Sequence, residues 1–417
     1  MVLKLSRVFG MAPLTFTPEG IKFSLVYYIY SIAFITALET TIFVGFVLDV
    51  THPKQSRRAA TTHMIWLAYQ SVLSAVTIVG CFAAPKRCRC ILDALTRIEK
   101  IRNFLGEIKS KKIVVIYMYA TIFSFLSAVA ILCFIDWFQN FYTAFYLNNQ
   151  VSLHLLSTFY VEYIIELLLE FQFMIVVIRL TRILRVVNGR LSKLLEVLDK
   201  KKRRNKKLLI NNFTLPKNIL FNNDSNQMEV NEEQASEEIR VLWLVYELVC
   251  DLIRRVNRGY GLILLLLLQS FFLHFIMTPY YMINLYQIPS GLSTLGQQVA
   301  WFHFHAASVI LIVEPCHGVQ QQMAKTRSLV SKLMCQTRPY GSLSRSLAAF
   351  FRSLTLEQPL IAPLGMSVLE RPLLITILGV VSTYLVPRHY FSFPNSTDKI
   401  FNGTDTAHVA NNLLLEN

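Results

Sequence analysis

Charged residues are scarce in this chain of 417 residues. Aspartate, glutamate, lysine and arginine together make up 16% of it, whereas hydrophobic residues make up 53% and the mean hydropathy is +0.43. An ordinary soluble domain carries about a quarter charged residues. The composition therefore excludes that class and indicates a polytopic membrane protein.

The sequence also lacks the short motifs around which common catalytic and metal sites are built. It contains no Walker loop, no nucleophile elbow and no HExxH helix. His303 and His305 are not at the i, i+4 spacing of a helical metal site, and Cys88 and Cys90 lack a second pair of ligands. We therefore expect no enzyme activity, no catalytic residue, no metal and no cofactor.

Neither a disulfide framework nor a cleaved leader is expected. None of the seven cysteines falls in a connection that we place outside the cell, so a disulfide framework is not expected. No apolar run of signal-peptide length precedes Lys22, so no cleaved signal is expected.

Long apolar segments are present instead, and they predict an all-α, polytopic membrane protein with seven transmembrane helices. A helix of about 20 residues covers roughly 30 Å, enough to cross a bilayer. We predict a cytoplasmic N-terminus at 1–23, a seven-helix membrane domain at 24–391 and an extracellular tail at 392–417. The predicted spans are 24–48, 62–84, 113–137, 155–178, 259–285, 298–318 and 372–391.

Helical periodicity continues past the fourth span and resumes before the fifth, which predicts cytoplasmic helix extensions. Between them, residues 211–238 are rich in Asn, Ser and Glu and have few large apolar residues. Such a segment buries too little apolar surface to offset the entropy of ordering it. It is predicted to be a flexible cytoplasmic insert.

The placement of positive charge predicts the orientation. Of the 41 lysines and arginines, 36 lie in segments that are cytoplasmic if the N-terminus is inside, and 5 lie on the other side, counting Arg388 at the outer end of the last predicted span. The other six predicted spans contain neither lysine nor arginine. The positive-inside rule then places the N-terminus in the cytoplasm and the C-terminus outside. The net charge of +15 faces anionic lipid, and no nucleic-acid binding is expected.

Polar and aromatic residues within the spans form the candidate ligand site. Glu162, Glu166 and Glu170 recur every four residues and so share one helix face, and carboxyl groups inside a membrane usually face a cavity or a polar partner. Aromatic walls with a few amide and imidazole groups suit a small organic ligand. The candidate ligand-binding residues are Tyr69, Gln70, Glu162, Glu166, His274, Thr278, Tyr281, Gln298, Trp301 and His305. The alternatives are a buried hydrogen-bonded network for the glutamates and an interfacial aromatic belt for the rings.

The end of the last span carries a partial motif. Thr383, Tyr384 and Phe391 match the spacing of a closing Thr-Tyr, five mostly apolar residues and Gln-Phe, with Tyr390 in place of the Gln and Pro387–His389 in place of apolar residues. Together with RVVNGRLSKLL (185–195), VNRGYGLILL (256–265) and the stretch 363–386, this motif resembles the insect gustatory receptors, which are related to the insect odorant receptors. The resemblance covers the whole chain.

The resemblance implies a tastant-gated, non-selective cation channel in chemosensory neurons. It implies a homotetramer, or a hetero-oligomer with other gustatory receptors, and a small-molecule tastant that is a bitter or other plant-derived compound or a sugar. The last helix of each subunit would line the pore, with Thr376, Thr383, Tyr384, Arg388, Tyr390 and Phe391 as candidate pore residues. Four copies of Arg388 near the outer mouth would raise an electrostatic barrier to cations.

Three other functions fit a multi-span chain. An insect odorant receptor shares the fold and topology but needs a co-receptor. A G-protein-coupled receptor requires the reverse topology and normally an extracellular cysteine pair. A secondary transporter would show internal repeats and paired broken helices, and no repeat is visible here.

The predicted orientation can be tested through the glycosylation sequons. Asn395 and Asn402 begin sequons in the predicted extracellular tail, whereas Asn212 and Asn223 begin sequons in the predicted cytoplasmic insert. We expect mutation of the tail pair, and not of the insert pair, to abolish the glycosidase-sensitive shift in gel mobility. Loss of the shift only in the insert mutant would reverse the topology.

Overall fold

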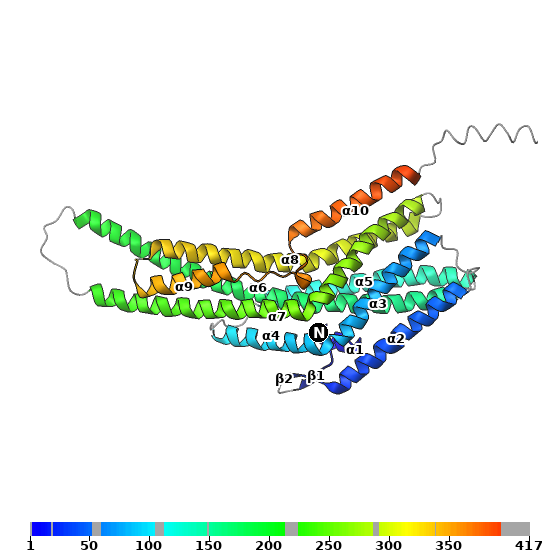
Figure 1. The fold of residues 1–417 in the computed structure, drawn as a ribbon, viewed down its shortest axis with the longest axis horizontal. Coiled ribbons are helices and arrows are strands. Elements are labelled where there is room, and N and C mark those ends of the chain that lie inside the picture. Colours follow the sequence, from blue (N-terminus) through cyan, green and yellow to red (C-terminus); the bar gives the residue numbers. More distant parts are fainter. Residues whose placement is uncertain are drawn as a thin grey trace, which may run out of the picture.

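The computed structural model describes residues 2–17, 20–51, 60–104, 112–147, 150–212, 224–286, 292–337 and 339–392. They form an elongated bundle of helices (Figure 1). The elements are α1 (Val2–Val8), β1 (Leu14–Thr17), β2 (Gly20–Phe23), α2 (Leu25–Thr51), α3 (Ala60–Phe82), α4 (Ala84–Phe104), α5 (Lys112–Leu147), α6 (Gln150–Asn212), α7 (Asp224–Tyr286), α8 (Leu292–Gln336), α9 (Ser342–Leu356), the 3₁₀ turn η1 (Pro363–Gly365) and α10 (Arg371–Ser392).

The prediction of an all-α, polytopic membrane protein is confirmed, and the predicted spans fall on α2, α3, α5, α6, α7, α8 and α10. Within the described residues, four helices (α2, α5, α7 and α8) are long and apolar enough to cross a membrane, and α3 with α4 makes a fifth if this pair, bent by 64°, is one span. Helix α6 does not pass the same test because Glu162, Glu166 and Glu170 interrupt its apolar stretch. Helix α10 has a shorter apolar part, Arg371–Thr383.

The second half of the range 211–238, predicted to be a flexible insert, is helical in the structure. Helix α7 begins at Asp224, so helix covers much of the range 211–238, while residues 213–223 lie outside the described part. The stretch from Asp224 contains no proline or glycine and joins the strongly helical segment that follows it. The costly step of helix formation is its first turn, and a segment that continues an existing helix avoids this step. A polar segment can therefore become helical when it adjoins a strongly helical one.

Helices α6, α7 and α8 extend together to one end of the bundle, and polar contacts join α6 to α8 there (Figure 1). Asn188 Nδ2 donates to the backbone carbonyl of Gln322 at 2.9 Å, and Asn188 Oδ1 accepts from Thr326 Oγ1 at 2.8 Å. Further along, Gln336 Nε2 donates to Asp199 Oδ1 at 2.8 Å. These hydrogen bonds satisfy polar groups in the packed interface and fix how the two helices are aligned along each other.

Helix α9 covers this extended end. Its buried residues Leu343, Leu347, Phe350 and Leu354 recur at helical spacing, so they form one apolar stripe against α7 and α8. The ring of Phe350 lies edge-on to Tyr246 of α7, with centroids 5.7 Å apart. Burial of this apolar stripe explains why the short helix α9 packs against α7 and α8.

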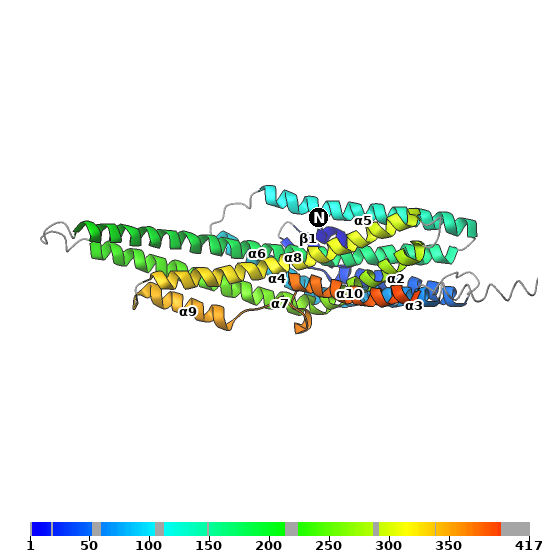
Figure 2. The ribbon, with the colours of Figure 1, turned by 90° about the horizontal axis from the view of Figure 1, so that it is seen from above.

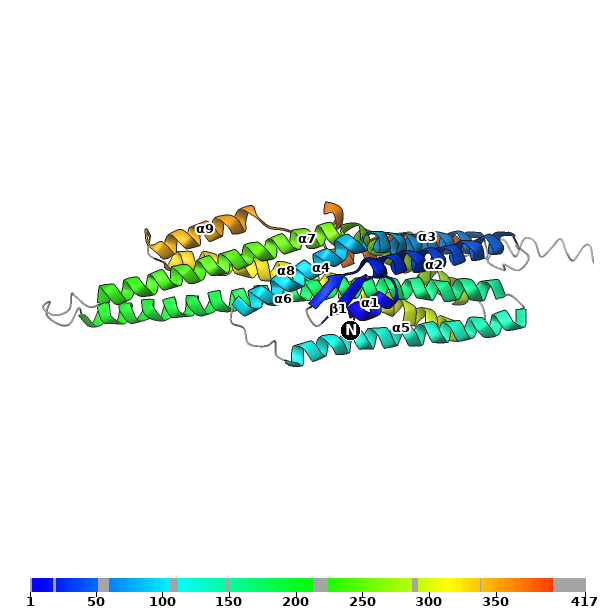
Figure 3. The same ribbon diagram turned by 90° about the horizontal axis from the view of Figure 1, so that it is seen from below.

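The N-terminal segment folds back against the bundle. Strands β1 and β2 form an antiparallel hairpin in which Leu14 lies opposite Phe23, and it sits beside α4 (Figure 3). Helix α5 runs along one edge of the bundle, with the N-terminus close to it (Figure 2). The hairpin was not predicted from the sequence.

A fully buried arginine joins this N-terminal segment to the bend between α3 and α4. The guanidinium of Arg87 donates from Nη1 to the carbonyl of Gly80 at 2.7 Å and from Nη2 to the carbonyl of Met11. The last carbonyls of a helix lose their partners where the helix ends, and α3 ends at Phe82. Arg87 therefore supplies donors that the bent backbone cannot supply itself.

Replacing Arg87 with methionine should destabilise the fold. Methionine keeps much of the volume but leaves two buried carbonyl groups without a donor, which costs about 1–3 kcal/mol for each such group. We expect a lower midpoint of thermal unfolding for the purified protein in detergent. The matched control is Lys86→Met, because Lys86 is exposed on the same turn of α4. Equal midpoints for the two variants would contradict this role for Arg87.

Candidate functional site

Five aromatic and imidazole rings meet in the interior of the bundle, each brought by a helix of the membrane domain. Tyr69 comes from α3, Tyr163 from α6, His274 from α7, and Trp301 and His305 from α8, and all five are buried. We call these five residues the ring cluster. The four helices converge only in the tertiary structure, so residues up to 236 positions apart become neighbours.

The rings contact one another in an ordered arrangement. The imidazoles of His274 and His305 stack with centroids 3.4 Å apart, and Trp301 stacks on the other side of His305 at 5.6 Å. The ring of Tyr163 meets Trp301 edge-on, with centroids 5.4 Å apart. Such edge-to-face and stacked pairs add to the stability that burial of the rings provides.

Two hydrogen bonds bind tyrosine hydroxyls to the imidazoles. The hydroxyl of Tyr69 is hydrogen-bonded to Nε2 of His274, and the hydroxyl of Tyr163 to Nδ1 of His305 at 3.1 Å. Both pairs join different helices. The cluster thus combines large apolar ring faces with a few groups that donate and accept hydrogen bonds, which is the composition of sites for small organic ligands.

A polar group lies next to the ring cluster, centred on Glu162 of α6. Its carboxylate accepts hydrogen bonds from Gln70 Nε2 and from Ser74 Oγ, the latter at 3.0 Å, so α3 and α6 are joined here. Gln70 and Ser74 also line a cavity of about 190 Å³ between α2 and α3, together with Glu39. Since Gln70 follows Tyr69 directly, the polar group and the ring cluster are adjacent.

The other two glutamates of α6, Glu166 and Glu170, are buried with fewer hydrogen bonds than Glu162. Both carboxylate oxygens of Glu166 lack a hydrogen-bond partner within the described residues, as does one oxygen of Glu170. The hydroxyl of Ser270 on α7 is buried close to Glu166, without a hydrogen bond of normal geometry in the described part of the chain. Unsatisfied polar groups of this kind are rare in folded proteins and often mark functional positions.

The structure brings together Tyr69, Gln70, Glu162, His274, Trp301 and His305 among the predicted ligand-binding residues. Thr278 is buried and lies one turn from His274, and Gln298 is half-buried. Neither hydrogen-bonds to the ring cluster within the described part of the chain. Tyr281 is half-buried and lies beside Tyr280, with ring centroids 6.0 Å apart.

The predicted pore residues lie on α10. The hydroxyls of Thr376 and Thr383 are exposed and bonded to their own helix, to the carbonyls of Pro372 (3.1 Å) and Gly379 (2.8 Å). Tyr384, Arg388, Tyr390 and Phe391 belong to α10, but their side chains lie outside the described part. The predicted glycosylation sites Asn395 and Asn402 lie outside the described residues altogether.

Sequence reasoning missed Tyr163, which contacts three members of the ring cluster. The signal was present in the spacing of α6: Phe159 and Tyr163 are four residues apart, on a face beside that of the glutamates, and their rings stack at 6.4 Å. Phe304 of α8 also packs against Tyr163, with centroids 6.1 Å apart. Within the described residues, no three His, Cys, Asp or Glu side chains are placed to hold a metal ion.

Comparison of the sequence with known proteins identifies a matching family and a relative. Residues 1–386 match the sequence model of a family described as 7tm Chemosensory receptor. The gustatory receptor for sugar taste 43a of Drosophila melanogaster is 24% identical over 131 residues. That alignment covers 31% of this chain and 30% of the relative, so the chain matches less than a third of the relative's length.

The fold is similar to that of the insect olfactory receptor OR5 from Machilis hrabei. The TM-score is 0.53 at 12% identity, with 92% of this chain and 95% of that chain covered. The structure of the same receptor in complex with eugenol gives a TM-score of 0.54 at 11% identity, with the same coverage. At this level of identity, the similarity shows a common fold.

Substitutions at Glu162 should separate its role as an acceptor from its charge. In Glu162→Leu, Gln70 and Ser74 both lose their acceptor, and we expect a loss of stability of about 1–3 kcal/mol for each unsatisfied group. Glu162→Gln retains one carbonyl acceptor in the same shape, so its loss should be clearly smaller. Thermal unfolding of the purified variants measures the difference. Equal destabilisation by both substitutions would show that the hydrogen bonds do not set the stability of this site.

Proposed function

Because the chain belongs to the 7tm chemosensory receptor family, we propose that it is a gustatory receptor that acts as a tastant-gated, non-selective cation channel. The family is one of receptors and not of enzymes. The observation that carries the proposal is the ring cluster, in which four helices of a chemosensory receptor fold converge on rings with a few hydrogen-bonding groups. A ligand that enters among these rings changes how α3, α6, α7 and α8 pack.

The ring cluster with the group around Glu162 suits a small polar organic molecule. Ring faces pack against the C–H faces of a sugar or against a plant-derived aromatic compound, while the amide of Gln70 and the two imidazoles form hydrogen bonds to hydroxyl groups. The partial alignment with a gustatory receptor for sugar taste supports the sugar as one candidate. A bitter or other plant-derived compound is the other.

The exposed surface of α10 supports its role as the helix that lines a shared pore. Ile375 is 74% exposed and Leu378 52% exposed in the single chain, whereas Val381 is buried. Helix α10 diverges from the rest of the bundle (Figure 1). An apolar helix that its own chain leaves uncovered fits an assembly in which other subunits and lipid cover it, and we propose a homotetramer on this basis.

An ion pair connects the start of α10 to α8, the helix that carries Trp301 and His305. Arg371 donates to both oxygens of Glu314, from Nε at 3.0 Å and from Nη2 at 2.6 Å. Both side chains are more than half exposed, so the pair contributes little to stability. Its two-point geometry nevertheless fixes the direction in which α10 leaves α8. A shift of α8 at the ring cluster would therefore be passed to α10.

The second candidate is an odorant receptor subunit that requires a co-receptor. The similarity of the fold to olfactory receptor OR5 favours it as the alternative, since both kinds of receptor share this architecture. Expression of this chain alone separates the two. A tastant-evoked current without a co-receptor supports the gustatory function, and a current only on co-expression supports the odorant function. Saturable uptake without channel current would instead indicate a transporter.

Substitution at His305 tests the ring cluster as the ligand site. His305→Phe keeps a ring in the stack but removes the nitrogen that bonds to Tyr163. We expect the half-maximal tastant concentration to rise about tenfold, equivalent to about 1.4 kcal/mol of binding free energy. His303→Phe is the matched control, because His303 lies two residues away on α8 and is exposed. An equal response of both variants would place the ligand elsewhere.

A further inference from the structure

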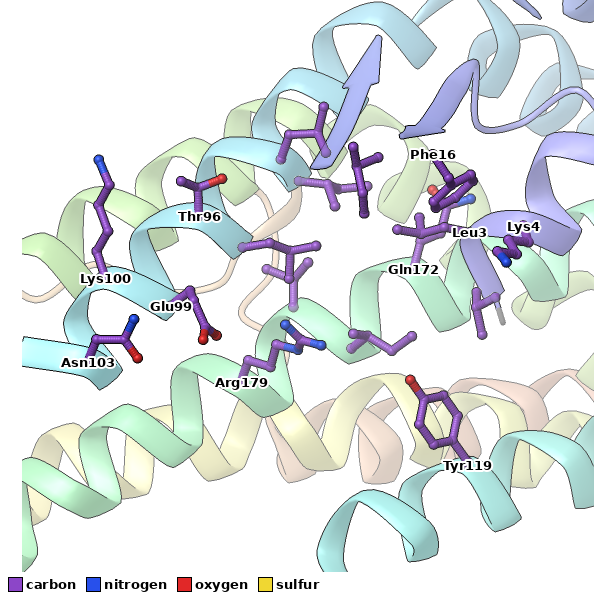
Figure 4. Close-up of a pocket in the computed structure, with 17 residues that line it drawn as sticks. Leu3, Lys4, Phe16, Thr96, Glu99, Lys100, Asn103, Tyr119, Gln172 and Arg179 are labelled. Carbon is purple, nitrogen blue, oxygen red and sulfur yellow. The ribbon is translucent and has the colours of Figure 1, made fainter. Parts of the chain in front are cut away.

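A second cavity lies away from the ring cluster, where the N-terminal segment meets α4, α5 and α6 (Figure 4). Its volume is about 550 Å³. Its apolar wall includes Ile91, Leu92 and Leu95 of α4 and Ile175 and Val176 of α6. An apolar wall by itself would indicate only a space between packed helices and would not indicate a ligand.

The charged residues that line this cavity are mostly cationic. Lys4 comes from α1, Lys100 from α4 and Arg179 from α6, against the carboxylate of Glu99. None of the three cations forms an ion pair with a carboxylate within the described residues. Three separate elements thus bring positive charge to one cavity, and that arrangement favours an anionic ligand with strong acceptor oxygens.

Gln172 gives an independent indication of a ligand. Its side chain lines the cavity and is only 2% exposed, yet both its amide nitrogen and its amide oxygen lack a hydrogen-bond partner within the described residues. An unpaired amide buried in this way costs free energy, so native structures normally give it a partner. Gln172 lies on α6 two turns before Arg179, and Figure 4 shows both at the cavity.

The position of the cavity relative to the bilayer identifies the kind of anion. With the proposed orientation, Arg179 directly follows the fourth span, Tyr119 lies near the inner end of the third, and Lys4 and Lys100 are cytoplasmic. The cavity therefore lies at the inner boundary of the membrane, with apolar walls toward the hydrocarbon and cations at the level of the headgroups. That leaflet carries the anionic phospholipids.

We propose that this cavity binds an anionic phospholipid of the inner leaflet, with its phosphate at Arg179, its polar glycerol region at Gln172 and its acyl chain along α4 and α6. Lys4 and Lys100 add positive charge at the two ends of the cavity (Figure 4). The proposal rests on the proposed orientation and not on the tastant or the pore. A bound lipid would join α1, α4 and α6. Occupancy would therefore stabilise the N-terminal segment on the bundle.

The experiment uses the full-length receptor reconstituted into phosphatidylcholine nanodiscs, with and without phosphatidylinositol 4,5-bisphosphate or phosphatidylserine. The readouts are the thermal unfolding midpoint and the lipid retained on the protein, measured by mass spectrometry. The cavity variant combines Lys4→Gln, Lys100→Gln and Arg179→Gln. The matched control combines Lys86→Gln, Arg182→Gln and Arg185→Gln, which removes the same charge from residues that do not line the cavity.

We expect the anionic lipids to raise the unfolding midpoint of the wild type and of the control, and the cavity variant to bind them about 100-fold more weakly. An equal loss in the control would mean diffuse attraction of lipid to a basic surface and would overturn the proposal. So would the absence of any anionic-lipid effect. Stabilisation by soluble inositol 1,4,5-trisphosphate or inorganic phosphate to the same extent as by the lipid would show a phosphate site without a lipid and would overturn the lipid assignment.

Gln172→Leu is a second test, which distinguishes loss of lipid binding from misfolding of the triple cavity variant. Removing an unpaired buried amide should leave the midpoint in pure phosphatidylcholine unchanged or higher, while the increase caused by anionic lipid becomes smaller. A lower midpoint in pure phosphatidylcholine with an unchanged lipid effect would overturn the role of Gln172. Failure of the lipid proposal would leave tastant-evoked currents untouched, so the two proposals can fail separately. An outward N-terminus in the sequon experiment would also overturn the lipid assignment.

Discussion

Helix α6 carries three carboxyl groups into the apolar part of the bundle, and the arrangement around it depends on how their burial is compensated. A polar group taken out of water is costly unless it finds a partner. Glu162 finds two donors on α3, which explains why α3 lies against α6 at this level. Within the described residues, both carboxyl oxygens of Glu166 and one of Glu170 have no hydrogen-bond partner, so the stretch of α6 that holds the candidate site residues is incompletely satisfied.

The same principle accounts for the second cavity, on the other side of α6. Gln172 lies only two residues after Glu170 and is buried without a hydrogen-bond partner among the described residues, but it faces a cavity with cationic residues. A single helix thus presents unsatisfied groups to two different spaces. One lies beside the ring cluster, and the other lies between α4, α5 and the N-terminal segment. Small-molecule recognition and lipid recognition would then act on the same helix from two sides.

Contacts away from the ring cluster hold these helices at fixed positions. The Asn188 contacts fix α6 against α8, the stripe on α9 covers α7 and α8, and Arg371 ties α10 to α8 through Glu314. Helix α8 takes part in all three. Because α8 also carries Trp301 and His305, a ligand-induced change in the ring cluster would reach the proposed pore helix through this one helix.

The amino-acid sequence by itself determined the fold class and the family, since runs of apolar residues, helical periodicity and the spacing of Thr383, Tyr384 and Phe391 are local properties. It also identified the buried face of Glu162, Glu166 and Glu170, because a four-residue spacing suffices to place them together. It missed the helix that begins at Asp224, where composition suggested an irregular insert, because that helix continues from its neighbour.

Only the tertiary structure decided which helices meet. The stacking of His274 on His305, the part of Tyr163 in the ring cluster and the role of Arg87 at the bend of α3 all join residues from separate elements. No local pattern specifies such pairs, because they depend on how the helices pack. The cavity around Gln172 belongs to the same class, since α1, α4, α5 and α6 form it together and none of them shows it alone.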